Sequence, residues 1–225
     1  MDLSSRGICV SNFGHVALGF SGFDFQAHYC SAVMFYYWQE SGRKFSWFYL
    51  FLLFLYFISG MLNLFEDVEV LQYVMLVNMG IYFLLLLLVL LNIRRLKVQF
   101  LDRFNLFYVL LSAVFVGTLA YLSVFWVFNE SFKLYSYIIS YAIVLGVLGI
   151  GVSILYVYQP EKANVYLMYT VFCYLICDIF YIIYYYAYDF IFFRLLSILG
   201  SVVSYYCLVN FFLRTNENIG IQGYL

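Results

Sequence analysis

Six apolar stretches of membrane length determine what this chain can fold into. Each runs for about 20 residues or more, which is the length that an α-helix needs to cross the hydrocarbon core of a bilayer. Over the whole chain 66% of the residues are hydrophobic and only 10% are charged, whereas soluble domains contain about 25% charged residues. We therefore expect an all-α, polytopic transmembrane helical bundle. The predicted spans are residues 47–65, 70–93, 104–128, 133–158, 164–188 and 190–213.

The first 45 residues differ from the rest of the chain. Residues 1–25 are rich in Gly and Ser and contain Asn12, His15 and Asp24, so no span is predicted there. The apolar stretch 27–38 is about a dozen residues long, which suits a partial or interfacial helix better than a full crossing. The chain then divides into three parts. These are an N-terminal segment (1–45), a transmembrane helical bundle (46–214) and a polar cytoplasmic tail (215–225).

Basic residues between the spans are distributed unequally over the two sides of the bundle. One side carries eight of them: Arg43, Lys44, Arg94, Arg95, Lys97, Arg103, Lys162 and Arg214. The other side carries Lys133, with Arg194 just inside a helix. Lys and Arg accumulate in cytoplasmic loops. We therefore expect a multi-pass protein of the cytoplasmic (plasma) membrane with its C-terminus in the cytoplasm.

The composition argues against several functions. The only histidines are His15 and His28, the five cysteines have no zinc-binding spacing, and we expect no metal and no cofactor. A net charge of −1 gives no basic surface for nucleic acid. The six spans contain no mid-helix lysine for a retinal Schiff base and no histidine for a metal-dependent intramembrane protease. Membrane lipids are the expected partners.

A single carboxylate, Asp178, lies within the fifth stretch, NVYLMYTVFCYLICDIFYIIYYYAY. A charged side chain at bilayer depth costs at least ~2.5 to 3.5 kcal/mol, so it favours a functional site. The alternative is that Asp178 is protonated or hydrogen-bonded to a neighbouring helix and only helps the bundle to pack. Residues three, four or seven apart share a helical face. Asp178 therefore shares a face with Thr170, Tyr174, Tyr181 and Tyr185, which we predict to point into the bundle.

Depth along the spans suggests which side chains meet Asp178. At about 1.5 Å per residue, Asp178 lies ~15 Å and Arg194 ~6 Å from the outer ends of their spans. A long arginine side chain that reaches inward makes Arg194 the leading charge partner. Asn78 lies at nearly the same depth in the second span. The first span carries its own polar stripe of Tyr56, Ser59, Asn63 and Glu66. We predict a polar pocket in the outer half of the bilayer lined by Asn63, Glu66, Asn78, Asp178 and Arg194, with Tyr174 and Tyr181 as further binding residues.

Small residues line one face of two spans. The fourth span carries Ala142, Gly146, Gly149 and Ser153, and the sixth carries Ser197, Gly200, Ser201 and Ser204. Small side chains at this spacing let helices approach closely, so we expect these faces to be packing faces.

The segment ICDIFYIIYYYAYDF, followed by LLSILGSVVSYYCLVNFFL, resembles the last two helices of the YhhN-type lysoplasmalogenase family. In that family a small residue followed by Asp lies in the penultimate helix, which matches Cys177 and Asp178. A tyrosine in the final helix matches Tyr205 or Tyr206. The resemblance implies hydrolysis of the vinyl-ether bond of a lysoplasmalogen, which releases an aldehyde and a glycerophospho head group.

Such a reaction needs an acid to protonate the alkenyl carbon and a base to activate water, so two carboxylates are its natural apparatus. Asp178 is the expected acid. The family's upstream Gly-Asp is not matched, because Met61 follows Gly60, and Glu66 at the end of the first span is the candidate base. Arg194 would position Asp178 or a phosphate. The alternative function is a non-enzymatic lipid-binding or transport protein with the same pocket around Asp178.

Overall fold

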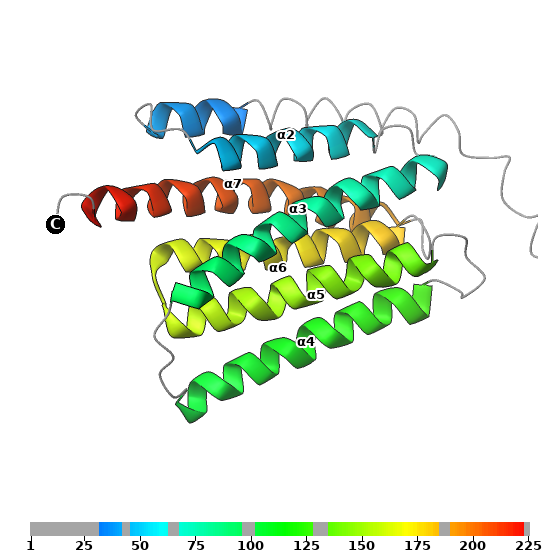
Figure 1. The fold of residues 1–225 in the computed structure, drawn as a ribbon. Helices are drawn as coiled ribbons and strands as arrows, with labels where there is room; N and C mark the ends of the chain where they lie inside the picture. The colour runs from blue at the N-terminus through cyan, green and yellow to red at the C-terminus, as the bar shows by residue number, and fades with distance from the viewer. Residues whose placement is uncertain are drawn as a thin grey trace, which may run out of the picture.

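The computed structural model describes residues 32–41, 46–62, 68–95, 102–127, 135–184 and 190–222, and within these ranges it contains helices and no strands (Figure 1). The labelled helices are α2 (Trp47–Leu62), α3 (Val68–Arg95), α4 (Arg103–Val127), α5 (Tyr135–Tyr158), α6 (Lys162–Ile182) and α7 (Ile191–Gln222). A further helix of residues 32–40 precedes α2. The prediction of an all-α helical bundle is confirmed.

Five of the helices are long and apolar enough to cross a membrane, judged by length and composition. Their candidate spans are Gln72–Arg94, Arg103–Tyr121, Tyr135–Tyr158, Lys162–Ile182 and Ile191–Thr215. Helix α2 has only 16 residues, about 24 Å at 1.5 Å per residue. The last residues of the predicted first span lie in the range 63–67, outside the described residues, so its full crossing stays a prediction.

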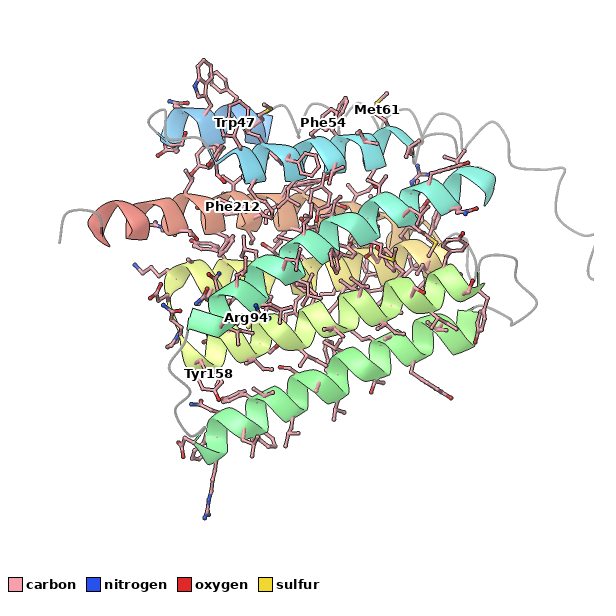
Figure 2. The ribbon with its side chains drawn as sticks, viewed as in Figure 1. Trp47, Phe54, Met61, Arg94, Tyr158 and Phe212 are labelled. Atoms are coloured by element: carbon pink, nitrogen blue, oxygen red, sulfur yellow. The ribbon has the colours of Figure 1, made fainter. Side chains whose placement is uncertain are left out.

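Consecutive helices run in opposite directions, so alternate ends meet on one side of the bundle (Figure 1). The N-terminal ends of α2, α4 and α6 lie on the same side as the C-terminal ends of α3, α5 and α7. Arg94 and Tyr158 mark this side in Figure 2, and Arg103 and Lys162 begin α4 and α6 there. We call this side the basic end of the bundle. The gathering of these basic residues on one side agrees with the loop charges, while the membrane side that they face stays a prediction.

Neighbouring helices in the bundle are not always neighbours along the chain. The closest backbone packing joins α6 to α7, α4 to α5, α3 to α5, α2 to α3 and α5 to α6. Helix α4 lies at the outside of the bundle, against α5 (Figure 1). Helix α5 therefore lies between α3 and α6 and contacts both.

The two faces of α2 differ in exposure. Trp47, Phe54 and Met61 are spaced seven residues apart and point away from the bundle, and Trp47 is 81% exposed (Figure 2). Tyr49 and Tyr56, on the opposite face, are buried. Because both faces are apolar or aromatic, this helix suits an environment in which acyl chains cover the outer face.

Helices α6 and α7 approach closely at Gly200. A Cβ atom at this position would lie 3.2 Å from the backbone oxygen of Cys173 and 3.3 Å from Cβ of Cys177. Next to this contact, the sulfur of Cys177 lies 3.0 Å from Oγ of Ser201 and 3.4 Å from Oγ of Ser197. The prediction that these small residues form a packing face is confirmed.

Candidate functional site

Asp178 lies on α6 and receives hydrogen bonds from two other helices. Its Oδ2 atom accepts one from the hydroxyl of Tyr82 on α3 at 2.8 Å and one from the hydroxyl of Tyr141 on α5 at 2.6 Å. The two hydroxyl oxygens are 3.3 Å apart. We call these three residues the Asp178 cluster. The carboxyl group therefore faces the interior of the bundle, as the spacing along α6 predicts.

Both tyrosines of the Asp178 cluster are buried, with 2% of Tyr82 and 8% of Tyr141 exposed. A polar group that leaves water for an apolar interior needs hydrogen-bond partners there, and the two hydroxyls supply them. Both donate to Oδ2, and Oδ1 accepts no hydrogen bond from the residues that the structure describes. Within the residues that the structure describes, Oδ1 is therefore the atom of Asp178 that can exchange a proton or contact a ligand.

Asp178 and Tyr141 lie toward the ends of their helices opposite the basic end, whereas Tyr82 lies near the middle of α3. Tyr141 is six residues into α5, and Asp178 is four residues before the last residue of α6, distances of about 9 Å and 6 Å along the helices. Helix α5 has 24 residues, about 36 Å, whereas the hydrocarbon core of a bilayer is about 30 Å thick. With α5 centred in a bilayer, Tyr141 lies about 6 Å inside the hydrocarbon boundary.

Tyrosine rings continue from the Asp178 cluster across the interior of the bundle. The tyrosine row consists, in order of contact, of Tyr141, Tyr82, Tyr174, Tyr56 and Tyr205. Successive ring centroids are 5.5, 5.6, 5.3 and 5.2 Å apart. Each ring comes from a different helix, so the row ties together α5, α3, α6, α2 and α7. Tyrosine suits this position because its ring packs against apolar neighbours while its hydroxyl remains available for hydrogen bonds.

Three other predicted site residues, Tyr174, Tyr181 and Asn78, have different surroundings in the bundle. Tyr174 belongs to the tyrosine row and is buried, and Tyr181 is partly buried near the end of α6. Asn78 accepts a hydrogen bond of 2.6 Å from Oγ of Ser59, one helical turn from Tyr82. The structure therefore brings Asn78 to α2 rather than to the carboxyl group of Asp178.

Arg194, the predicted charge partner of Asp178, contacts an aromatic ring at the end of α6, and its pairing with Asp178 stays a prediction. The Cζ atom of Arg194 lies 5.6 Å from the ring centroid of Tyr184, at the end of α6. The hydrogen bonds to Asp178 come from Tyr82 and Tyr141. An arginine this close to the start of α7 can contact an aromatic ring near the bundle end.

Two predicted site residues, Asn63 and Glu66, lie outside the described residues. The role of Glu66 as a base and the position of both side chains in a polar pocket stay predictions. Among the described residues, no group of three or more His, Cys, Asp or Glu side chains could hold a metal ion.

The sequence alone did not identify Tyr82 and Tyr141 as partners of Asp178. A signal for Tyr82 existed, because it lies four residues after Asn78 and therefore shares its helical face. Tyr141 lies near the same end of its span as Asp178. The chain contains 25 tyrosines, however, and only the packing of α3 and α5 beside α6 singles out these two.

Comparisons with protein-family models, curated proteins and solved structures find no match to this chain. The fold and its apolar helices are compatible with an integral membrane protein that has several spanning helices.

Replacing Tyr82 or Tyr141 with Phe should destabilise the protein, because each change removes a hydrogen bond to Asp178. The expected loss is about 0.5 to 1.5 kcal/mol for a neutral carboxyl group and about 1.5 to 3 kcal/mol for a charged one. Thermal unfolding of the purified protein measures this loss. Tyr108→Phe is the matched control, since Tyr108 lies exposed on α4.

The same substitutions should cost less in an Asp178→Ala background, because the hydrogen-bond acceptor is then already absent. Equal losses in both backgrounds would show that the tyrosine hydroxyls do not act through Asp178.

Proposed function

We propose that this chain is a multi-pass protein of the cytoplasmic membrane that hydrolyses the vinyl-ether bond of a lysoplasmalogen, with Asp178 as the catalytic acid. The observation that carries the proposal is the Asp178 cluster, an inward-facing carboxyl group whose Oδ2 accepts hydrogen bonds from two tyrosines and whose Oδ1 accepts none from the described residues. The resemblance of the last third of the chain to YhhN-type lysoplasmalogenases supplies the reaction class.

The first step is the addition of a proton to the substrate. Asp178 gives a proton from Oδ1 to the alkenyl carbon that is not bonded to oxygen, and the electrons of the double bond form the new C–H bond. The other alkenyl carbon becomes positive and shares this charge with the ether oxygen. The hydrogen bonds from Tyr82 and Tyr141 to Oδ2 stabilise the carboxylate that remains, because hydrogen bonds to a charged acceptor are the stronger ones.

Water completes the reaction. It adds to the positive carbon and returns a proton to the carboxylate of Asp178, which gives a hemiacetal and restores the acid. The hemiacetal then breaks its bond to the glycerol oxygen, and its hydroxyl proton moves to that oxygen. The products are an aldehyde and a glycerophospho head group. A single carboxyl group can act first as acid and then as base in this sequence, and Glu66 remains the candidate for a second base.

The depth of the Asp178 cluster supports a substrate bond close to the lipid head group. The vinyl-ether bond joins the glycerol to the first carbon of the hydrocarbon chain, so it lies at the boundary between the polar and apolar parts of a lipid. Tyr141, about 6 Å inside the hydrocarbon region, lies within reach of this bond. Arg194, nearer the start of α7, would then bind the phosphate. The remaining proposed substrate contacts are Asn63, Asn78, Tyr174 and Tyr181.

The proposal is tested by incubating the purified protein with a 1-alkenyl lysophospholipid and measuring aldehyde release. The matched control substrate is the 1-alkyl lysophospholipid, which has the same head group and chain but no double bond to protonate. We expect aldehyde from the alkenyl lipid and no cleavage of the alkyl lipid. Folded protein that binds the alkenyl lipid and releases no aldehyde would contradict the hydrolase proposal.

The second candidate is a non-enzymatic lipid-binding or transport protein. One observation favours it: Asp178 is the only Asp or Glu in the five candidate spans, and a second carboxylate is the usual partner of such an acid. This candidate predicts that the alkenyl and alkyl lipids raise the thermal unfolding midpoint equally, with no turnover of either.

A C-terminal reporter tests the proposed orientation in the membrane. Because basic residues gather on the side of the bundle where α7 ends, the positive-inside rule places the C-terminus in the cytoplasm. We expect a fluorescent protein that folds only in the cytoplasm to be bright when fused after residue 225. A phosphatase that is active only outside the cytoplasm should be inactive at the same position, and the reverse pattern would overturn the orientation.

A further inference from the structure

Two hydroxyl groups of the tyrosine row are buried without a hydrogen-bond partner in the described part of the chain. They belong to Tyr56 on α2, which is 5% exposed, and Tyr174 on α6, which is 4% exposed. Their rings are stacked with centroids 5.3 Å apart and an interplanar angle of 27°. Buried polar atoms are nearly always hydrogen-bonded, so each of these two hydroxyls needs a partner.

A third hydroxyl lies beside them. Ser204 on α7 is fully buried, and its Oγ donates a hydrogen bond of 2.6 Å to the backbone oxygen of Ser201. The hydroxyl of Tyr174 lies within interaction range of those of Tyr56 and Ser204, while the hydroxyls of Tyr56 and Tyr174 make no hydrogen bond to the residues that the structure describes. The lone pairs of Ser204 Oγ thus remain able to accept one. We call the three residues Tyr56, Tyr174 and Ser204 the hydroxyl trio.

We infer that the hydroxyl trio binds one oxygen atom that accepts hydrogen bonds. This oxygen belongs either to a water molecule or to a polar group of a bound lipid. The hydroxyls of Tyr56 and Tyr174 donate to this oxygen. A water molecule would also donate one hydrogen bond to Ser204, which gives it three partners, and buried water molecules typically have two to four.

This site is distinct from the Asp178 cluster but continuous with it. Tyr174 precedes Asp178 by four residues, about one turn of α6, and its ring contacts that of Tyr82 with centroids 5.6 Å apart. The site does not depend on the proposed hydrolysis. If Asp178 is the acid, the same site holds a polar oxygen about one turn of α6 away from it.

Thermal unfolding of Tyr56→Phe, Tyr174→Phe and the double variant tests the site. Each single change should lower the midpoint by about 2 to 4 °C, because the bound oxygen loses a donor. The double variant should fall by less than the sum of the two, since both hydroxyls hold the same oxygen. Tyr108→Phe on the exposed face of α4 is the control and should leave the midpoint unchanged.

Two conditions identify the source of the oxygen. A lowered midpoint in lipid-free detergent identifies water, and one that appears only after a lysophospholipid is added identifies a lipid oxygen. Midpoints that are unchanged or raised in both conditions would overturn the inference, because removing an unpaired buried hydroxyl is neutral or stabilising. Failure of aldehyde release by the wild type would leave this result untouched.

Discussion

Replacing Asp178 with Asn is expected to lower aldehyde release from a 1-alkenyl lysophospholipid by about 10²- to 10⁴-fold, the usual contribution of a general acid. Asn has nearly the same shape, and its side-chain oxygen can still accept the hydrogen bonds of Tyr82 and Tyr141. It has no acidic proton to give to the alkenyl carbon. The measurement is the initial rate with the purified variant, beside a thermal unfolding curve that shows that it is folded.

Two further variants show whether the loss is specific to an acid at this position. Asp178→Glu restores a carboxyl group and should recover part of the rate. Asp102→Asn removes a carboxyl group at the basic end of the bundle, far along the helices from the Asp178 cluster, and should leave the rate unchanged. A folded Asp178→Asn protein with the wild-type rate would mean that Asp178 serves only to pack the bundle.

Replacing Gly200 with Leu is expected to be the most damaging change to the fold outside the Asp178 cluster. A Cβ atom there already lies 3.2 to 3.4 Å from backbone and Cβ atoms of Cys173 and Cys177 on α6, and these atoms cannot rotate away. Forcing larger groups into a close-packed contact costs about 1 to 3 kcal/mol or more. Thermal unfolding should show a lower midpoint by several degrees.

The matched control is Gly117→Leu on α4. No heavy atom lies within 4 Å of a Cβ atom at Gly117, so the leucine has space on the outside of the bundle. Because Gly is a poor helix former, this change should be neutral or stabilising by up to about 1 kcal/mol. Equal midpoints for the two leucine variants would contradict the close approach of α6 and α7 at Gly200.

Hydrophobic length predicts most of the helices because crossing a membrane demands little else of a sequence. The span predicted at 133–158, for example, corresponds to α5 at Tyr135–Tyr158. The predicted end of the sixth span differs, since α7 continues to Gln222, beyond the apolar stretch that ends at residue 213. Hydropathy reports where a helix leaves the apolar region, whereas backbone hydrogen bonds can continue the helix through polar residues.

The candidate site was predictable only in part. Helical spacing places Asp178 and Tyr174 on one inward face of α6, and the structure agrees. The partners of Asp178 were not predictable, because spacing within one helix does not reveal which helices lie beside it. Depth along the span favoured Arg194, whereas Tyr82 and Tyr141 reach Asp178 because α3 packs on α5 and α5 packs on α6.

Hydrolysis of a 1-alkenyl lysophospholipid in deuterium oxide tests the central claim most directly. If Asp178 protonates the alkenyl carbon, its exchangeable proton is replaced by deuterium before the reaction. The aldehyde should then carry one deuterium on the carbon next to its carbonyl group, as measured by mass spectrometry. An aldehyde without that deuterium, or no aldehyde from folded wild-type protein, would contradict the account.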